Sequence, residues 1–146
     1  MIRIDQGLWI GVGLETNHAA AYSITGLLNA AHDLQCSVGW NDNIECMQVG
    51  LIDGPGNLHS AYYAAVLSLS VLHKRHKNVM VYCHEGSRAL AVAIMYLQTK
   101  ARRRWHEWYN LVRERIDVDL PEVNKAHIDM FDKLNWNLLN KLIGEP

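Results

Sequence analysis

The segment from Val81 to Leu90 combines three features that together can do chemistry on an anion. Cys83 ends an apolar run, and Gly86 and Arg88 follow it closely. A turn that leads into a helix aims several main-chain N–H groups and the positive end of the helix dipole at one point. That field favours a thiolate over a thiol, and an arginine guanidinium can hold two oxygens of a phosphate or sulfate. The segment therefore predicts an oxyanion site with a sulfur nucleophile at its base.

The elements on either side of this segment must position it. The run Asn78–Cys83 is typical of a buried central strand, and Ser87–Lys100 is typical of a helix. No polar stripe interrupts that helix between Ala89 and Leu97, so we expect it to be enclosed on all sides. In parallel α/β sheets, ligands bind beyond the carboxyl ends of the strands. The turn Cys83–Arg88 has that position.

The rest of the chain alternates between strand and helix patterns, without repeats or linkers. We expect a strand at Gly7–Val12, a short helix and then a buried strand near Leu27 and Leu28, a strand at Glu45–Asp53, a helix from Leu58 to about His76, a helix at Trp105–Ile116 and a last helix that begins at Pro121. This order predicts an α/β fold, with a mainly parallel central sheet of roughly four to five strands flanked by helices on both faces. Residues 1–146 are expected to form a single domain.

Composition narrows the classes of function. The net charge is −1 and 49% of the residues are apolar, which disfavours a disordered chain and makes nucleic acid an unlikely partner. The N-terminal residues carry charges where a secretory signal needs its apolar core, and the longest uncharged apolar run, Ala89–Leu97, is too short to cross a membrane. We therefore expect a cytoplasmic monomer. Three cysteines are too few for a disulfide framework, so free thiols are expected.

The sequence resembles the cysteine-dependent phosphatases of the tyrosine and dual-specificity type. Their signature is His-Cys-x5-Arg followed by Ser or Thr, between a strand and the core helix, and "VYCHEGSRA" is similar to it. The stretches "IDQGLWIGV", "LLNAAHDL" and "LVRERIDVDLPEVNKAHIDMFDKL" resemble further segments of the family, so the likeness covers nearly the whole chain. The resemblance implies a three-layer sandwich that hydrolyses a phosphorylated protein or a small phosphoester, without metal or other cofactor.

The resemblance also implies a role for each residue of the site. Cys83 would attack phosphorus, Arg88 and the loop amides from His84 to Ser87 would hold the phosphate oxygens, and Asp53 would protonate the leaving group. The side chains of His84 and Glu85 are expected to point outward and to tune the choice of substrate.

The assignment of the acid has alternatives. The motif "DGPG" is also a good turn, in which Asp53 would satisfy its own backbone. Asp117 and Asp119 are the alternative acids, because their loop could also reach the site.

Three departures from the family signature leave other functions open. Cys83 and Arg88 are separated by four residues instead of five, Tyr82 replaces histidine, and Ala89 replaces the hydroxyl residue. A phosphatase-like domain that binds an anion or a phosphorylated partner without turnover is one alternative. A second is a rhodanese-like sulfurtransferase, whose Tyr-Cys-x-x-Gly-x-Arg motif "YCHEGSR" matches, although the rest of the chain does not.

Two basic stretches admit a functional and a structural interpretation. "HKRH" (His73–His76) suggests a metal pair, but two imidazoles without a nearby cysteine or carboxylate favour a solvated helix end. "KARRR" (Lys100–Arg104) could contact a polyanion such as RNA or a phosphoinositide. The favoured interpretation is the exposed end of the core helix, where cations complement the helix dipole. We therefore predict no metal site.

Overall fold

A computed structural model describes residues 1–35, 43–101, 103–116 and 119–143. Within these residues the chain forms one five-stranded sheet in the order β1-β2-β5-β3-β4. The strands are β1 (Ile2–Asp5), β2 (Leu8–Val12), β3 (Gly26–Ala31), β4 (Glu45–Leu51) and β5 (Val79–Cys83). Four of them run parallel, and β1 pairs antiparallel with β2. The prediction of a mainly parallel α/β sheet is confirmed, and β1 is an addition to it.

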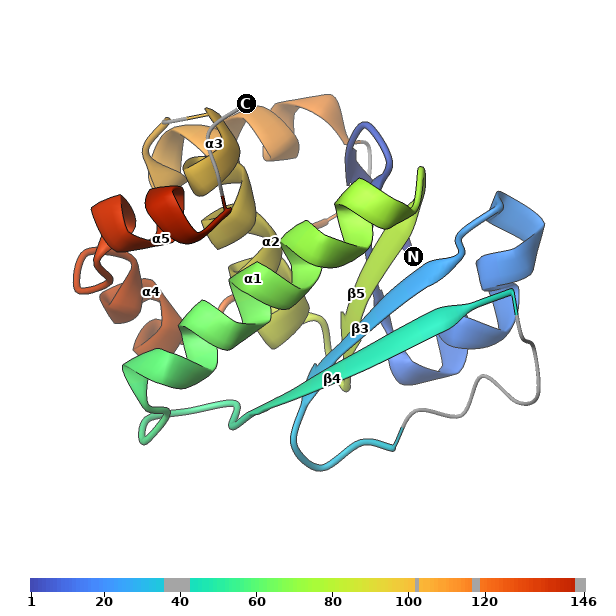
Figure 1. The fold of residues 1–146 in the computed structure, drawn as a ribbon, viewed down its shortest axis with the longest axis horizontal. Coiled ribbons are helices and arrows are strands. Elements are labelled where there is room, and N and C mark those ends of the chain that lie inside the picture. The colour runs from blue at the N-terminus through green and yellow to red at the C-terminus, as the bar shows by residue number, and fades with distance from the viewer. Residues whose placement is uncertain (36–42, 102, 117–118, 144–146) are drawn as a thin grey trace.

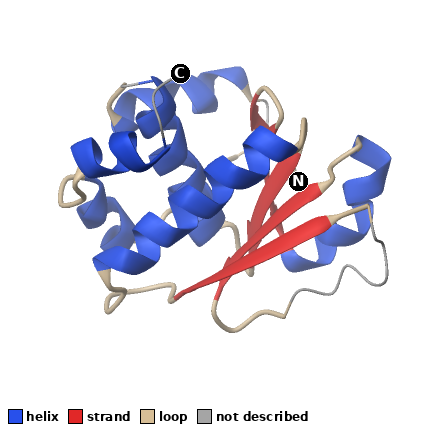
Figure 2. Ribbon diagram, viewed as in Figure 1, coloured by secondary structure: helices blue, strands red, loops and turns tan. Residues whose placement is uncertain are grey.

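Helices cover both faces of this sheet, as expected. The helices are η1 (Gly13–Tyr22, a 3-10 helix), α1 (His59–Arg75), α2 (Ser87–Ala101), α3 (Trp105–Arg115), α4 (Lys125–Phe131) and α5 (Trp136–Ile143). Figures 1 and 2 show α1 to α5 on one side of the sheet and η1 on the other. Both α1 and α2 pack directly on the strands, while α3, α4 and α5 lie outside α2. None of the helices in the described part of the chain is long and apolar enough to cross a membrane.

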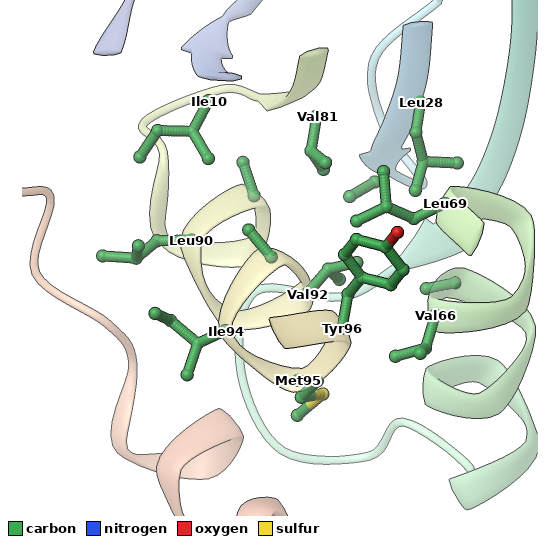
Figure 3. Packing of buried hydrophobic residues seen from close by; sticks show 14 of the residues in the cluster. Ile10, Leu28, Val66, Leu69, Val81, Leu90, Val92, Ile94, Met95 and Tyr96 are labelled. Atoms are coloured by element: carbon green, nitrogen blue, oxygen red, sulfur yellow. The ribbon is translucent and has the colours of Figure 1, made fainter. Parts of the chain in front are cut away.

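The core explains why β5 and α2 hold the candidate loop firmly. β5 lies between β2 and β3, and each of its residues is buried. Every residue of α2 from Ala89 to Leu97 exposes 5% of its surface or less, so the prediction of an enclosed helix is confirmed. Figure 3 shows Val81, Leu90, Val92 and other side chains of these two elements packed in one apolar cluster. A strand and a helix buried on all sides fix both ends of the loop between them.

The last helix differs from its prediction. It is two helices, because α4 ends at Phe131 and α5 begins at Trp136. The start at Pro121 is also wrong: the side chain of Asn124 accepts a hydrogen bond from Ala126 N at 2.9 Å and caps α4. The apolar spacing continues across the break because Leu134 in the turn is itself buried, so periodicity alone cannot reveal it.

The prediction of three free cysteines is wrong for one residue. Cys83 is a free, buried thiol, whereas Cys46 in β4 is disulfide-bonded. Cys36 lies outside the described residues. An odd count of three argues against a framework of several disulfides but is compatible with one.

Candidate active site

The loop between β5 and α2 gathers main-chain N–H groups around a sulfur atom. The Sγ atom of Cys83 accepts hydrogen bonds from the N–H of Gly86 at 3.1 Å and from the N–H of Ala89 at 3.4 Å. Cys83 exposes 1% of its surface, so the sulfur forms the floor of the loop. Tyr82, the residue before Cys83, packs in the apolar cluster on the η1 face of the sheet.

Gly86 allows the loop to close within four residues. Its φ angle is +94°, in the left-handed region that disfavours residues with a Cβ atom. A Cβ atom there would lie 2.5 Å from Cγ of Pro121, on the segment that precedes α4. Both the turn and the contact with Pro121 therefore require glycine.

We expect Gly86→Ala to lower the free energy of unfolding by about 1–3 kcal/mol, because it adds backbone strain and a steric overlap. Gly54→Ala is the matched control, since a Cβ atom at Gly54 meets nothing within 4 Å. The control should change stability by less than about 0.5 kcal/mol. Chemical denaturation measures both variants, and equal effects would contradict this account of Gly86.

Arg88 lies at the start of α2 with only part of its guanidinium engaged. The residue exposes 3% of its surface, and Nη1 donates to Oδ1 of Asp33 at 3.0 Å and to the carbonyl oxygen of Leu51 at 2.9 Å. Nε is buried and has no hydrogen-bond acceptor among the described residues. An unpaired buried N–H group costs about 1–3 kcal/mol. An oxygen of a bound oxyanion would remove that cost, which supports an anion site beside Cys83.

Asp33 is a site residue that the sequence interpretation missed. It follows β3, the strand next to β5, and pairs with Arg88. His84 Nε2 also lies 3.4 Å from its Oδ1. Partial desolvation alone would raise the pKa of Asp33, but the hydrogen bond and charge of Arg88, with the nearby His84, hold it below its ordinary value. The available signal was positional, because the carboxyl ends of neighbouring parallel strands meet at one edge of the sheet.

Asp53 lies against the same loop. It comes two residues after β4, and its Oδ1 accepts a hydrogen bond from Ser87 Oγ at 3.1 Å. The turn that follows is held by the side chain of Asn57, which accepts from Ile52 N and donates to Ile52 O, both at 2.8 Å. Asn57 performs the backbone role that the alternative interpretation gave to Asp53. The carboxylate therefore faces the loop.

A buried histidine forms the second contact of this carboxylate. His127 in α4 is fully buried, and its Nε2 lies 3.0 Å from Oδ1 of Asp53. Its Nδ1 lies 2.7 Å from the hydroxyl of Tyr62 in α1, to which Asn57 Nδ2 donates at 3.3 Å. The sequence analysis did not single out His127. The available signal was its position between Val123 and Phe131, at the four-residue spacing of one helix face.

His127 should make the protein less stable in mild acid. Burial lowers the pKa of His127 below its ordinary value of 6.5; the hydrogen bond to Asp53 opposes this, and the charge of Arg88 adds to it. The unfolded chain then takes up the proton at a higher pH than the folded one, so the free energy of unfolding should fall as the pH drops below about 6.5. His127→Gln should flatten this dependence in denaturation measured across pH, whereas His18→Gln, at an exposed position, should not. Parallel curves for the two variants would contradict the assignment.

The remaining predicted site residues lie as follows. His84 and Glu85 are both exposed, as expected for side chains that point outward. Asp119 is exposed and forms no hydrogen bond with the Cys83 loop within the described ranges, while Asp117 lies outside them. In the "HKRH" stretch, His73 and His76 are half-buried: His73 Nδ1 lies 2.7 Å from the Tyr96 hydroxyl, and His76 Nε2 lies 2.8 Å from Oε1 of Glu45. The premise that no carboxylate lies near these two histidines is therefore wrong.

The fold is that of the dual-specificity phosphatases. The structure of DUSP15 has a TM-score of 0.79 and 15% identity, and the match covers 98% of this chain and 92% of that one. Human DUSP28 has a TM-score of 0.76 and 16% identity, and the match covers 97% of this chain and 96% of that one. PTPMT1 in complex with PI(5)P has a TM-score of 0.71 and 13% identity, and the match covers 97% of this chain and 95% of that one. No family model matches the sequence, and no curated protein sequence matches it. The predicted resemblance is thus confirmed at the level of the fold.

Proposed function

We propose that this protein is a phosphomonoester hydrolase that works through a cysteinyl-phosphate intermediate. One observation carries the proposal: three groups lie together at the end of β5. They are the Cys83 sulfur, which accepts hydrogen bonds from two loop N–H groups, Arg88, whose buried Nε is unpaired among the described residues, and the Asp53 carboxylate, which is hydrogen-bonded to the same loop. These are a nucleophile, an anion clamp and a proton donor. The phosphatase fold supports the same class of reaction.

The proposed reaction uses water and groups of this chain. The Cys83 thiolate attacks phosphorus, the bond from phosphorus to the ester oxygen breaks, and Asp53 gives its proton to the leaving oxygen. Water then attacks the cysteinyl phosphate, and Asp53 takes a proton from that water. The bond between sulfur and phosphorus breaks, inorganic phosphate leaves, and the thiolate is restored. Arg88 and the loop amides from His84 to Ser87 bind the phosphoryl oxygens throughout.

The substrate class that we propose is a phosphorylated protein, with phosphotyrosine as the first candidate, or a small phosphoester. PTPMT1, which has a similar fold, was solved in complex with PI(5)P, so a phosphoinositide is a further candidate substrate. We propose one domain over residues 1–146 that acts as a monomer. The cytoplasmic location stays a proposal, and the disulfide of Cys46 is an observation against it.

Turnover of an aryl phosphate by the purified protein tests the function. We expect release of the phenol and of one phosphate for each substrate consumed. Binding of phosphate without any turnover would replace the proposal by the anion-binding alternative. Formation of thiocyanate from thiosulfate and cyanide would replace it by sulfur transfer.

Anion binding without turnover is the second candidate, and two observations favour it. The loop has one residue fewer than the family signature, and Ala89 has no hydroxyl to assist departure of the thiolate, although its N–H contacts the sulfur. Insertion of one residue after Gly86 separates the candidates. A sharp rise in turnover would show that the native loop is a weakened catalyst, and a loss would show that the short loop is functional.

A further inference from the structure

We propose that His127 is a positioning residue that, together with Tyr62, fixes the Asp53 carboxylate so that Oδ2 is the oxygen that carries the transferred proton. This inference rests on the proposed function, because it assigns the support of the general acid in that reaction. It depends on a chain of hydrogen bonds from Asn57 through Tyr62 and His127 to Asp53.

An ionised Asp53 carboxylate can only accept a hydrogen bond, so His127 must donate to it from Nε2 and accept at Nδ1, which fixes the hydrogens along these hydrogen bonds. Asn57 Nδ2 can only donate, so the Tyr62 oxygen accepts at 3.3 Å and the proton of the Tyr62 hydroxyl remains available. That proton goes to Nδ1 of His127, 2.7 Å away. The neutral imidazole thus carries its proton on Nε2, which donates to Oδ1 of Asp53 at 3.0 Å.

Burial keeps this imidazole neutral. His127 is fully buried, and desolvation holds its pKa below the ordinary value against the opposing hydrogen bond to Asp53. A neutral donor orients the carboxylate without placing a full positive charge against it. Asp53 can then exchange a proton while its orientation is maintained.

The two oxygens of Asp53 consequently differ. Oδ1 accepts from both His127 Nε2 and Ser87 Oγ, whereas Oδ2 has no hydrogen-bond partner in the part of the chain that the structure describes. Asn124, at the start of α4, ties the same groups together: its N–H donates to Ser87 Oγ at 2.9 Å and its Nδ2 donates to the Asp53 carbonyl at 3.3 Å. The acid is therefore held against the nucleophile loop by α1 and α4, with one oxygen left for the reaction.

Two substrates with different leaving groups test the role. An acid matters most when the leaving oxygen is strongly basic, so we compare phenyl phosphate with the activated 4-nitrophenyl phosphate. His127→Phe keeps the ring volume but loses both hydrogen bonds. We expect its kcat on phenyl phosphate to fall by about 10-fold or more, with less than about a 3-fold change in kcat on 4-nitrophenyl phosphate and in both KM values. Tyr62→Phe loses the hydrogen bonds of the Tyr62 hydroxyl to Asn57 and His127 but keeps the one between His127 and Asp53. It should show the same pattern more weakly.

A conservative variant and a control complete the kinetic test. His127→Gln retains an N–H donor toward Asp53, and we expect it to restore the kcat on phenyl phosphate to within about 3-fold of the unsubstituted protein. His18→Gln, at an exposed position, should leave kcat unchanged on both substrates. Equal losses on both substrates, or no loss in His127→Phe, would overturn the positioning role. If His127→Phe fails to fold, Tyr62→Phe and His127→Gln decide the question alone.

Nitrogen chemical shifts of the His127 ring test the geometry without any turnover. We expect a neutral ring with the proton on Nε2 and with Nδ1 as an acceptor at pH 7, and a shift of the Nδ1 signal in Tyr62→Phe. A proton on Nδ1, or a charged ring, would overturn the inference even in an active enzyme. Absence of turnover in the unsubstituted protein, with the expected shifts, would instead refute the proposed function and the catalytic role while leaving the hydrogen-bond chain in place.

Discussion

Cys83→Ser is expected to abolish hydrolysis of an aryl phosphate, with a loss of kcat on the order of 10⁴-fold or more, as when a catalytic nucleophile is removed. A serine hydroxyl at this position stays protonated and is a much weaker nucleophile than a thiolate. The N–H groups of Gly86 and Ala89 donate hydrogen bonds to the sulfur of Cys83. These two donors alone cannot turn a serine hydroxyl into an effective nucleophile. Steady-state release of the phenol measures the effect.

Anion binding is the internal control for this variant. Arg88 and the loop amides are unchanged in Cys83→Ser, so its affinity for inorganic phosphate, measured by calorimetry, should stay within about 3-fold of the original. Lost turnover with retained binding assigns the chemistry to the sulfur. Full activity in Cys83→Ser would exclude a cysteinyl-phosphate mechanism.

Arg88→Lys should lower kcat/KM for the same substrate by roughly 10²- to 10³-fold, the usual cost of losing an oxyanion donor. The guanidinium uses Nη1 for Asp33 and for the Leu51 carbonyl and still has Nε for a ligand oxygen. A lysine ammonium is a point charge without this fork, so it cannot bind Asp33 and the phosphate in the same geometry. The loss should therefore appear in kcat as well as in KM.

Arg104→Lys is the matched control, because Arg104 is exposed just before α3. It should leave kcat/KM unchanged. A similar loss in both variants would indicate a long-range effect of charge, and an unchanged Arg88→Lys would contradict the anion clamp.

The elements that carry the site were predictable because their burial is total. A strand between two parallel neighbours and a helix enclosed on all sides both give continuous apolar runs, and β5 and α2 do so. β1 was not predictable in this way, because Arg3 and Asp5 interrupt its four residues at the edge of the sheet. The break between α4 and α5 was hidden by the buried Leu134, as described above.

The site itself was predictable only in part. Cys83 and Arg88 belong to one loop, so their spacing reveals their relation, and the structure also brings Asp53 to Ser87 of that loop. Asp33 and His127 contact their partners across 55 and 74 residues of sequence. Such pairs depend on which strands are neighbours and where a helix begins, and neither is encoded locally. The residues that support the chemistry were therefore harder to find than those that would perform it.

The most direct test of the central claim is to trap the intermediate. Asp53→Asn should slow hydrolysis of the cysteinyl phosphate more than it slows formation of the cysteinyl phosphate from 4-nitrophenyl phosphate, because 4-nitrophenol is a good leaving group and needs little help from an acid. After rapid quenching of this variant with labelled substrate, we predict phosphate on the peptide that contains Cys83, in an amount that approaches one per protein molecule. Product formation without any phosphate on Cys83 would contradict the account.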